Sequence, residues 1–252
     1  VRGHRFMASE FCAPVSAANY VETLMQAKVM VEASARGQAI EGAARGLAEE
    51  KHCALVDDPA LVNETAGLVE WPVPLLGRID DAFMDVPDEV LTSVMRTHQK
   101  YFALKNPETN QLAPYFITIA NIETSDQGAA IIAGNERVLR ARLSDGRFFW
   151  DQDRKTSLEA RLPALEKIVF HARLGTVAEK TARLEKLAAE LGDMLGGEAA
   201  SAGMAARLCK ADLVSGMVYE FPELQGIMGG YYADNDGLDA RVGAAIRAHY
   251  AP

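Results

Sequence analysis

The chain has 252 residues, of which 49% are hydrophobic and 24% are charged, and this average composition excludes a disordered or collagen-like protein. Its length is sufficient for one large or two ordinary domains, and we expect two. The net charge of −9 excludes the broad basic surface of a non-specific nucleic-acid binder, so that any RNA contact must be local.

The sequence carries no signal for export or membrane insertion. It lacks an apolar run of the roughly 20 residues that a spanning helix needs, and its first residues lack the order of a signal peptide. Cys12, Cys53 and Cys209 have no short spacing, which predicts reduced, buried thiols rather than disulfides or a zinc cluster. We expect a cytoplasmic protein with no membrane partner. Because the chain starts at Val1 rather than at methionine, we also expect a fragment of a longer protein.

The first predicted elements are two helices. Ser16 is placed to cap the first of them. Its apolar residues recur at helical spacing and include Tyr20, Leu24 and Val31. The second helix is alanine-rich and runs from about residue 36 to residue 51.

Mixed structure is predicted next, because short segments between Val56 and Asn121 are separated by prolines. Two stretches, 101–104 and 115–119, have the β-branched and aromatic content of strands. The intervening residues 106–110 fit a hairpin loop. We therefore predict an α+β domain over residues 1–125.

A polar, turn-forming stretch at residues 124–128 marks the predicted domain boundary, and residues 126–252 are predicted to form an all-α domain. Thr176 and Glu179 have the spacing of a capping box at the start of a helix. Apolar residues line one face of that helix: Val177, Leu184, Leu187, Leu191 and Leu195. Three further helices are predicted at about 199–220, 223–232 and 238–250.

A first candidate RNA contact lies in the run Met95–Phe102, which mixes basic and aromatic residues. Such a mixture can hold phosphates while it stacks on unpaired bases. The candidate residues are Arg96, His98, Lys100 and Tyr101. In the alternative interpretation the two ends of the run lie in the core. Arg96 and Lys100 then form a solvated helix face, and His98 is a hydrogen-bonded connector.

A second candidate lies on residues 135–147, which carry four arginines against Glu136 and Asp145. The predicted helix has an apolar stripe of Leu139, Leu143 and Trp150. This stripe leaves the arginines at the surface. The candidates for contact with an RNA backbone or a partner chain are Arg137, Arg140 and Arg147. The alternative is a solvated face on which the two acids pair with the arginines.

Two other motifs fail on their chemistry. Asp234–Gly237 begins like a calcium loop, but Asp239 and Ala245 stand where that loop needs a glycine and a bidentate glutamate. Gly226–Gly230 lacks the lysine of a P-loop and a preceding strand. Close packing of a helix against a neighbour is the expected reason for its glycines.

Three stretches carry a resemblance to a known family. The most particular is KADLVSGMVYEFPELQGIMGGYYA at residues 210–233. The second is LVEWPV at 68–73 together with MRTHQKYF at 95–102, and the third is GNERVLRARLSD at 134–145 followed by FFW at 148–150. Taken in chain order they resemble the β subunit of bacterial heterotetrameric glycyl-tRNA synthetase, and from residue 68 to residue 233 they span most of the chain.

The resemblance implies partners and a division of labour. In that family the enzyme attaches glycine to its tRNA by activation with ATP and then transfer. A separate α subunit holds the ATP, magnesium and glycine site, and the β subunit recognises the tRNA for glycine. This stretch would hold no cofactor and no catalytic residue. It would work with the α subunit, the tRNA and the remainder of the β chain, including a C-terminal anticodon-binding domain.

The two halves resemble different domains. The first resembles part of the phenylalanyl-tRNA synthetase β chain, and the second a degenerate HD-type helical domain. His171, Lys210 and Asp212 stand at the degenerate HD positions. A metal-dependent phosphohydrolase is one alternative, although the Lys210 ammonium repels a metal ion and offers it no lone pair. A structural role, as a Lys210–Asp212 pair or as a helix cap, is the other interpretation of these positions. A pure assembly module without RNA contact is the third function considered.

Overall fold

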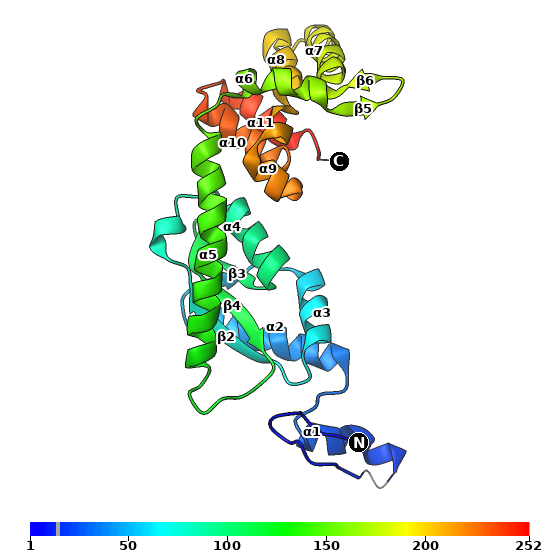
Figure 1. Cartoon of the computed structure of the whole chain (residues 1–252), viewed down its shortest axis with the longest axis vertical. Helices are drawn as coiled ribbons and strands as arrows, with labels where there is room; N and C mark the ends of the chain where they lie inside the picture. The colour runs from blue at the N-terminus through cyan, green and yellow to red at the C-terminus, as the bar shows by residue number, and fades with distance from the viewer. Residues whose placement is uncertain (14–15, 252) are drawn as a thin grey trace. The chain divides into compact units, whose positions relative to one another are not determined.

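The computed structural model describes residues 1–13 and 16–251, which form two compact units divided between Ser144 and Asp145 (Figure 1). The division falls inside helix α5 (Ala129–Asp153), whereas the sequence predicted it at residue 125. The polar turn does precede α5, but the first turns of this helix belong to the first unit. Glu136 of α5 accepts a hydrogen bond from the Arg78 amide at 2.9 Å. The composition of the sequence indicates where helices and strands end. It does not indicate the division between the units, because α5 continues from one unit into the other.

The first unit is an antiparallel sheet with helices. Its elements are α1 (Tyr20–Gln26), α2 (Ala33–Glu49), β1 (Ala54–Leu55), α3 (Pro59–Leu68), β2 (Val73–Arg78), α4 (Asp88–Val94), β3 (Phe102–Lys105), β4 (Leu112–Ala120) and the first part of α5. A 3-10 turn at Ala17–Asn19 precedes α1, another lies at Asp81–Phe83, and a π-helical turn at Met95–Gln99 follows α4. The strand order is β1-β3-β4-β2.

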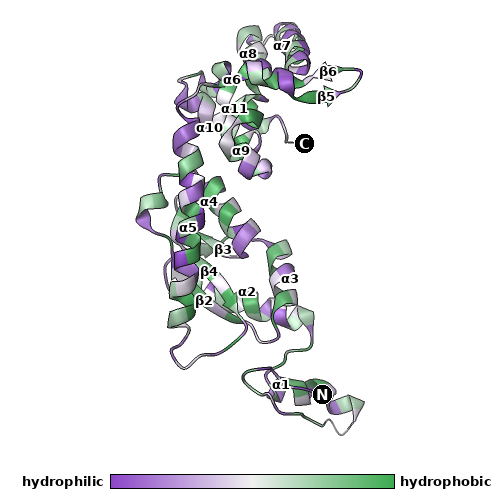
Figure 2. Cartoon of the chain, viewed as in Figure 1, coloured by the Kyte–Doolittle hydropathy of each residue, from purple (hydrophilic) through white to green (hydrophobic). Residues whose placement is uncertain are grey.

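The predicted hairpin is confirmed, since β3 pairs with β4 around the loop at residues 106–110 and Phe102 lies opposite Ile117. The core against this sheet includes Ile40 of α2, Leu61 of α3 and Leu104 of β3, all 2% exposed or less. Figure 2 shows the same elements with their hydrophobic stretches in green. Burial of such aliphatic side chains stabilises the unit by about 1.5–3 kcal/mol each.

Three details of the first unit differ from prediction. The first helix ends at Gln26, because Lys28 adopts a left-handed backbone with φ 59°, so Val31 lies outside it. Strand β2 contains Pro74 and was not predicted; it lies at the sheet edge, where a missing amide is tolerated. Cys12 and Cys53 are half-buried, and only Cys209 is a buried thiol.

The second unit is mainly helical. Its elements are the end of α5, α6 (Leu158–Arg161), β5 (Val169–His171), β6 (Gly175–Thr176), α7 (Val177–Met194), α8 (Ala199–Leu208), α9 (Gly216–Glu220), α10 (Ile227–Asn235) and α11 (Ala240–Ala248). Further 3-10 turns lie at Leu162–Lys167, Ala211–Val214 and Pro222–Leu224. No helix in the described ranges has the length and hydropathy needed to cross a membrane.

The all-α prediction for this half is wrong in one place, because β5 and β6 form an antiparallel hairpin. Its strands are too short to show an alternating pattern, and its turn depends on Gly175, which has φ +87°. The capping box is confirmed: the Glu179 amide donates to Thr176 Oγ1 at 3.2 Å, and the Thr176 amide donates to Glu179 at 2.7 Å. The helix predicted at 199–220 is instead divided into α8, a 3-10 turn and α9. Membership of the HD-type fold stays a resemblance.

A buried carboxylate connects the elements of this unit. Asp153, at the end of α5, accepts hydrogen bonds from the Gly216 and Met217 amides at 3.0 and 2.8 Å. The Tyr232 hydroxyl donates to it at 3.0 Å, and Arg161 Nη2 donates at 3.2 Å. Asp153 and Arg161 are both 8% exposed or less. The carboxylate therefore ties α5 to α6, to the start of α9 and to α10.

Replacement of Gly77 tests the packing of the first unit. A Cβ at this position would lie 2.6 Å from Phe116 Cε1, a side chain that is fully buried. We expect Gly77→Ala to lower the free energy of unfolding by about 1–3 kcal/mol, measured by urea denaturation. Combination with Phe116→Leu should be less destabilising than the sum of the two changes. Additive effects would show that these residues do not compete for space.

Removal of the buried carboxylate tests the second unit. We expect Asp153→Ala to lower the free energy of unfolding by about 3–5 kcal/mol, because it leaves the Arg161 charge buried without its partner. Asp151→Ala is the matched control two residues away, since its pairs with Arg147 and Arg154 are exposed. The control should change stability by less than about 0.5 kcal/mol. Equal effects in urea denaturation would contradict this assignment.

Candidate functional site

The first basic run follows α4 directly and is largely paired with acids. Its π-helical turn ends at Lys100, which has a left-handed backbone with φ 57°. Arg96 Nε lies 2.5 Å from Asp58 Oδ2, and Lys100 Nζ lies 2.8 Å from Glu64 Oε1. The Arg96 guanidinium lowers the pKa of the Asp58 carboxyl, mainly through this hydrogen bond. The positive charge counted along the sequence is thus offset by acids at and within α3.

The aromatic members of this run lie in the core. Tyr101 is 3% exposed, stacks on Phe116 at a centroid distance of 4.6 Å and donates to Asn135 Oδ1 at 2.5 Å. Burial raises the pKa of Tyr101 to about 12. Met95 and Phe102 are also buried, as the alternative interpretation predicted, while His98 is exposed. The Tyr101 ring therefore has no open face on which an RNA base could stack.

The arginines of α5 are more accessible. In the first unit Arg140 Nε lies 3.3 Å from Asp80 Oδ2, and both side chains are more than two-fifths exposed. Arg137 and Arg142 are exposed, and no carboxylate in the described residues forms an ion pair with either. Glu136 accepts from a backbone amide and does not pair with them. Arg147, in the second unit, lies 3.5 Å from Asp151.

The degenerate HD positions do not form one site. His171 is exposed on β5, and its Nδ1 accepts a hydrogen bond from the Arg173 amide at 3.1 Å. Asp212 is fully buried and accepts from the Gly226 and Gly229 amides at 2.6 and 3.1 Å. Burial raises the pKa of this carboxyl. Across residues 1–13 and 16–251 no three His, Cys, Asp or Glu side chains are grouped so as to hold a metal.

Asp212 therefore has the helix-capping role that the structural interpretation predicted, because the two amides lie at the start of α10. The glycines of this segment are explained by the same packing. A Cβ at Gly229 would lie 2.8 Å from Ile246 Cγ2, and Gly226 has φ +82°.

Lys210 contacts residues that the sequence did not connect with it. Its Nζ lies 2.8 Å from His249 Nε2 and 3.7 Å from the centroid of the Tyr250 ring. His249 and Tyr250 follow α11, 39 residues along the chain from Lys210 in the case of the histidine. Because Lys210 and His249 lie so far apart in the chain, no short sequence pattern contains both residues, and the contact could not be predicted from the sequence.

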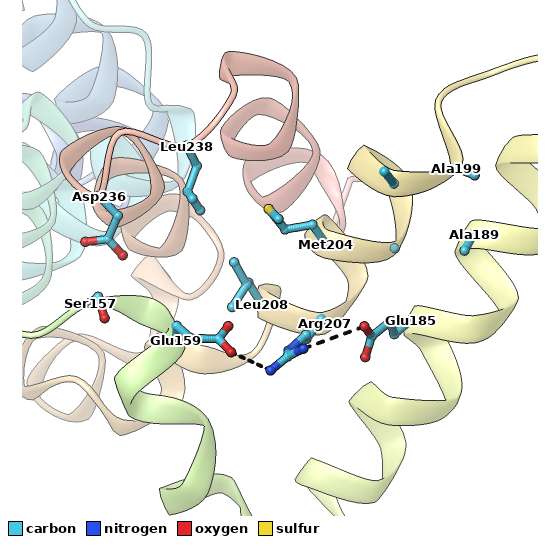
Figure 3. Close-up of a pocket in the computed structure, with 12 residues that line it drawn as sticks. Ser157, Glu159, Glu185, Ala189, Ala199, Met204, Arg207, Leu208, Asp236 and Leu238 are labelled. Atoms are coloured by element: carbon cyan, nitrogen blue, oxygen red, sulfur yellow. Dashed lines mark hydrogen bonds and ion pairs between the residues drawn. The ribbon is translucent and has the colours of Figure 1, made fainter.

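A pocket of about 570 Å³ lies between α7 and α8 and beside residues 236–238 (Figure 3). Arg207 reaches toward Glu159 and toward Glu185, whose Oε1 lies 3.9 Å from Nη1. Met204, Leu208 and Leu238 contribute apolar surface. Three carboxylates, Glu159, Glu185 and Asp236, line this pocket against one guanidinium, and no motif in the sequence indicated it.

Comparisons with known proteins cover the entire chain. The sequence matches, over residues 1–252, the model of a family described as glycyl-tRNA synthetase beta subunit. Relatives named glycine tRNA ligase beta subunit include one from Phenylobacterium zucineum, 52% identical over 99% of this chain, and one from Rhodospirillum centenum, 52% identical over all of it. A third, from Chromohalobacter salexigens, is 45% identical over all of this chain. The chain spans 38%, 35% and 36% of the lengths of these relatives.

Substitution of Asp212 tests its capping role. Asp212→Ala leaves two buried amides without an acceptor and should lower the free energy of unfolding by about 1–3 kcal/mol. Asp212→Asn keeps one acceptor oxygen and should cost less.

The pH dependence of stability in the same variants shows whether the protonated or the ionised form of Asp212 stabilises the folded chain. A raised pKa in the folded state means that the folded chain retains a proton that the unfolded chain has lost. The contribution of Asp212 to stability is therefore greatest below the unfolded pKa of about 4 and declines as pH rises through the folded value. The disadvantage of Asp212→Asn in urea denaturation should shrink as pH rises above the unfolded pKa of about 4. A disadvantage that grows with pH would instead mean that the ionised carboxylate stabilises the fold.

Proposed function

The chain belongs to the glycyl-tRNA synthetase beta subunit family, and from this membership we propose that it binds and positions tRNA and takes part in subunit assembly. The reaction served is the ATP-dependent attachment of glycine to its tRNA. ATP, magnesium and glycine are bound on the separate α subunit, and this stretch of the β subunit supplies no catalytic residue. Its partners are the α subunit, the tRNA for glycine and the remainder of the β chain.

The observation that carries the tRNA proposal is the presence of exposed arginines without carboxylate partners on an acidic chain. Arg137 and Arg142 of α5 have this property in the described part of the first unit. A phosphate that approaches them displaces only counterions, whereas one that approaches Arg96 or Lys100 must compete with an existing ion pair. We therefore assign the phosphate contacts in this unit chiefly to α5, with Arg140 as an exposed and weakly paired neighbour.

Phosphate contacts of this kind fix orientation and carry little sequence information. Their contribution to the reaction is positional: they hold the tRNA while the partner subunit performs the chemistry, so that the reacting groups meet in a defined geometry. Neither a nucleophile nor a proton-transfer pair is required from these side chains.

Assembly is supported by a different observation. The apolar face of α7 is incompletely covered, and Leu187, Leu191 and Leu195 are 53%, 45% and 83% exposed. Exposed apolar side chains gathered on one face favour contact with another protein surface. The relatives are more than twice as long as this chain, and the remainder of the β chain is the partner that we assign to this face.

The phosphohydrolase alternative has little support from the geometry. Its essential carboxylate, Asp212, is fully buried and accepts two backbone hydrogen bonds. A metal ion would have to displace those amides and to be bound beside the Lys210 ammonium.

Charging assays on the assembled enzyme test the proposal. Arg137→Ala with Arg142→Ala should reduce kcat/KM for the tRNA by about 10-fold or more and should lower the salt slope of tRNA binding by about 1 for each arginine replaced. Arg96→Ala with Lys100→Ala should have a smaller effect, because both cations are already paired. Lys186→Ala, an exposed lysine of α7, is the control. Unchanged charging in the arginine variant, with subunit assembly intact by sedimentation, would refute the assignment to α5.

A further inference from the structure

Two lysines and a histidine of the second unit have no role in the function proposed above. Lys180 lies on α7, Lys210 follows α8, and His249 follows α11. We call these three residues the cationic cluster. Lys210 Nζ lies 2.8 Å from His249 Nε2. Lys180 lies one helical turn before Leu184, which lines a groove together with Cys209 and His249, and its charge acts on both of the other residues.

The hydrogen bonds define the protonation of this cluster. His249 Nδ1 lies 2.6 Å from the Ile246 carbonyl oxygen, which accepts a proton but cannot donate one. Nδ1 therefore carries the hydrogen of the imidazole, and Nε2 accepts from the Lys210 ammonium. Burial, with the neighbouring ammonium groups, lowers the pKa of His249 and keeps the ring neutral at physiological pH. The two positive charges of the cluster are those of the lysines.

These charges have no counter-ion in the fold. No carboxylate in the described residues forms an ion pair with Lys180 or Lys210. The acidic groups that act on Lys210 are the Cys209 thiol and Asp212, and Asp212 is engaged with the amides of α10. Burial and the charge of Lys180 both lower the pKa of Lys210. An anion bound between the ammonium groups would relieve this repulsion.

Aromatic rings accompany both lysines. Lys180 Nζ lies 3.9 Å from the centroid of the Phe170 ring, and Lys210 Nζ lies 3.7 Å from that of Tyr250. Phe170 and Tyr250 are 43% and 49% exposed. An apolar groove of about 470 Å³, lined by residues of α7 and α8 and by Cys209 and His249, adjoins the cluster. Its α7 side includes Leu187 and Leu191, which are assigned above to a protein partner. Cations beside open rings match the phosphates and bases of an unpaired nucleic-acid strand.

We propose that the cationic cluster binds a backbone phosphate of single-stranded RNA through Lys180 and Lys210, while a neighbouring base contacts the exposed ring of Phe170. The inference rests on the proposed tRNA-binding function and gives the second unit its own RNA contact. An unpaired end or loop of the tRNA has the required chemistry, since bases stacked within a duplex present no free face. His249 orients the Lys210 ammonium and makes no direct contact with the RNA.

The test measures binding of the tRNA for glycine to the assembled enzyme while salt is raised. Lys180→Gln and the double variant Lys180→Gln with Lys210→Gln are compared with Lys186→Gln, which removes one exposed charge from the same helix. We expect the salt slope to fall by about 0.7 for each cluster lysine removed, with a loss of affinity of about 3-fold to 10-fold each at physiological salt. The control should leave both quantities nearly unchanged. Lys180→Gln is informative even where the double variant fails to fold, because Lys180 is not fully buried.

Separate outcomes identify which idea fails. Wild-type enzyme that does not bind the tRNA at low salt overturns the proposed function and this inference with it. Wild-type binding with the same salt slope in both cluster variants overturns only the inference. Unchanged tRNA binding together with loss of the α subunit in sedimentation would assign the cluster to an acidic protein surface instead, which also overturns it.

Discussion

The second unit depends on one buried carboxylate. Asp153 receives two amides at the start of α9, a hydroxyl from α10 and a guanidinium from α6. A charge in a low-dielectric interior is costly unless its lone pairs are satisfied, and here four donors satisfy it. Displacement of any of these elements would leave a charge or an amide unpaired, so the arrangement is held as a set.

Asp212 shows a similar use of acid. It stands at one of the positions that the resemblance to HD-type domains would give to a metal ligand, but its oxygen accepts from two amides of α10. An oxygen that is buried and engaged with two backbone amides is not available to a cation. The buried acids of the second unit thus support helices.

The distribution of unpaired charge connects structure with function. In the first unit Arg96 and Lys100 pair with Asp58 and Glu64, whereas no carboxylate in the described residues pairs with Arg137 or Arg142. An acidic chain repels nucleic acid at a distance, so contact requires places where positive charge is uncompensated. Such places, rather than the number of basic residues in a stretch, define where an RNA backbone is expected to lie.

Features that depend on neighbouring residues could be predicted from the amino-acid sequence. The β3–β4 hairpin, the alanine-rich helix, the Thr176–Glu179 capping box and the family were all evident from short patterns. The hairpin, the helix and the capping box depend on hydrogen bonds or packing between residues close in the chain, so short patterns are sufficient to predict them. The family was recognised from the residues of three short stretches.

The identity of the unpaired charges, in contrast, emerged only from the packing of the whole chain. Arg96 meets Asp58 from 38 residues away, and Lys210 meets His249 from 39 residues away. Packing also placed Tyr101 in the core and the division between units inside α5. Pairing and burial at such separations depend on how whole elements pack, and a charge or a ring looks the same in the sequence whether its partner is water, a carboxylate or another ring.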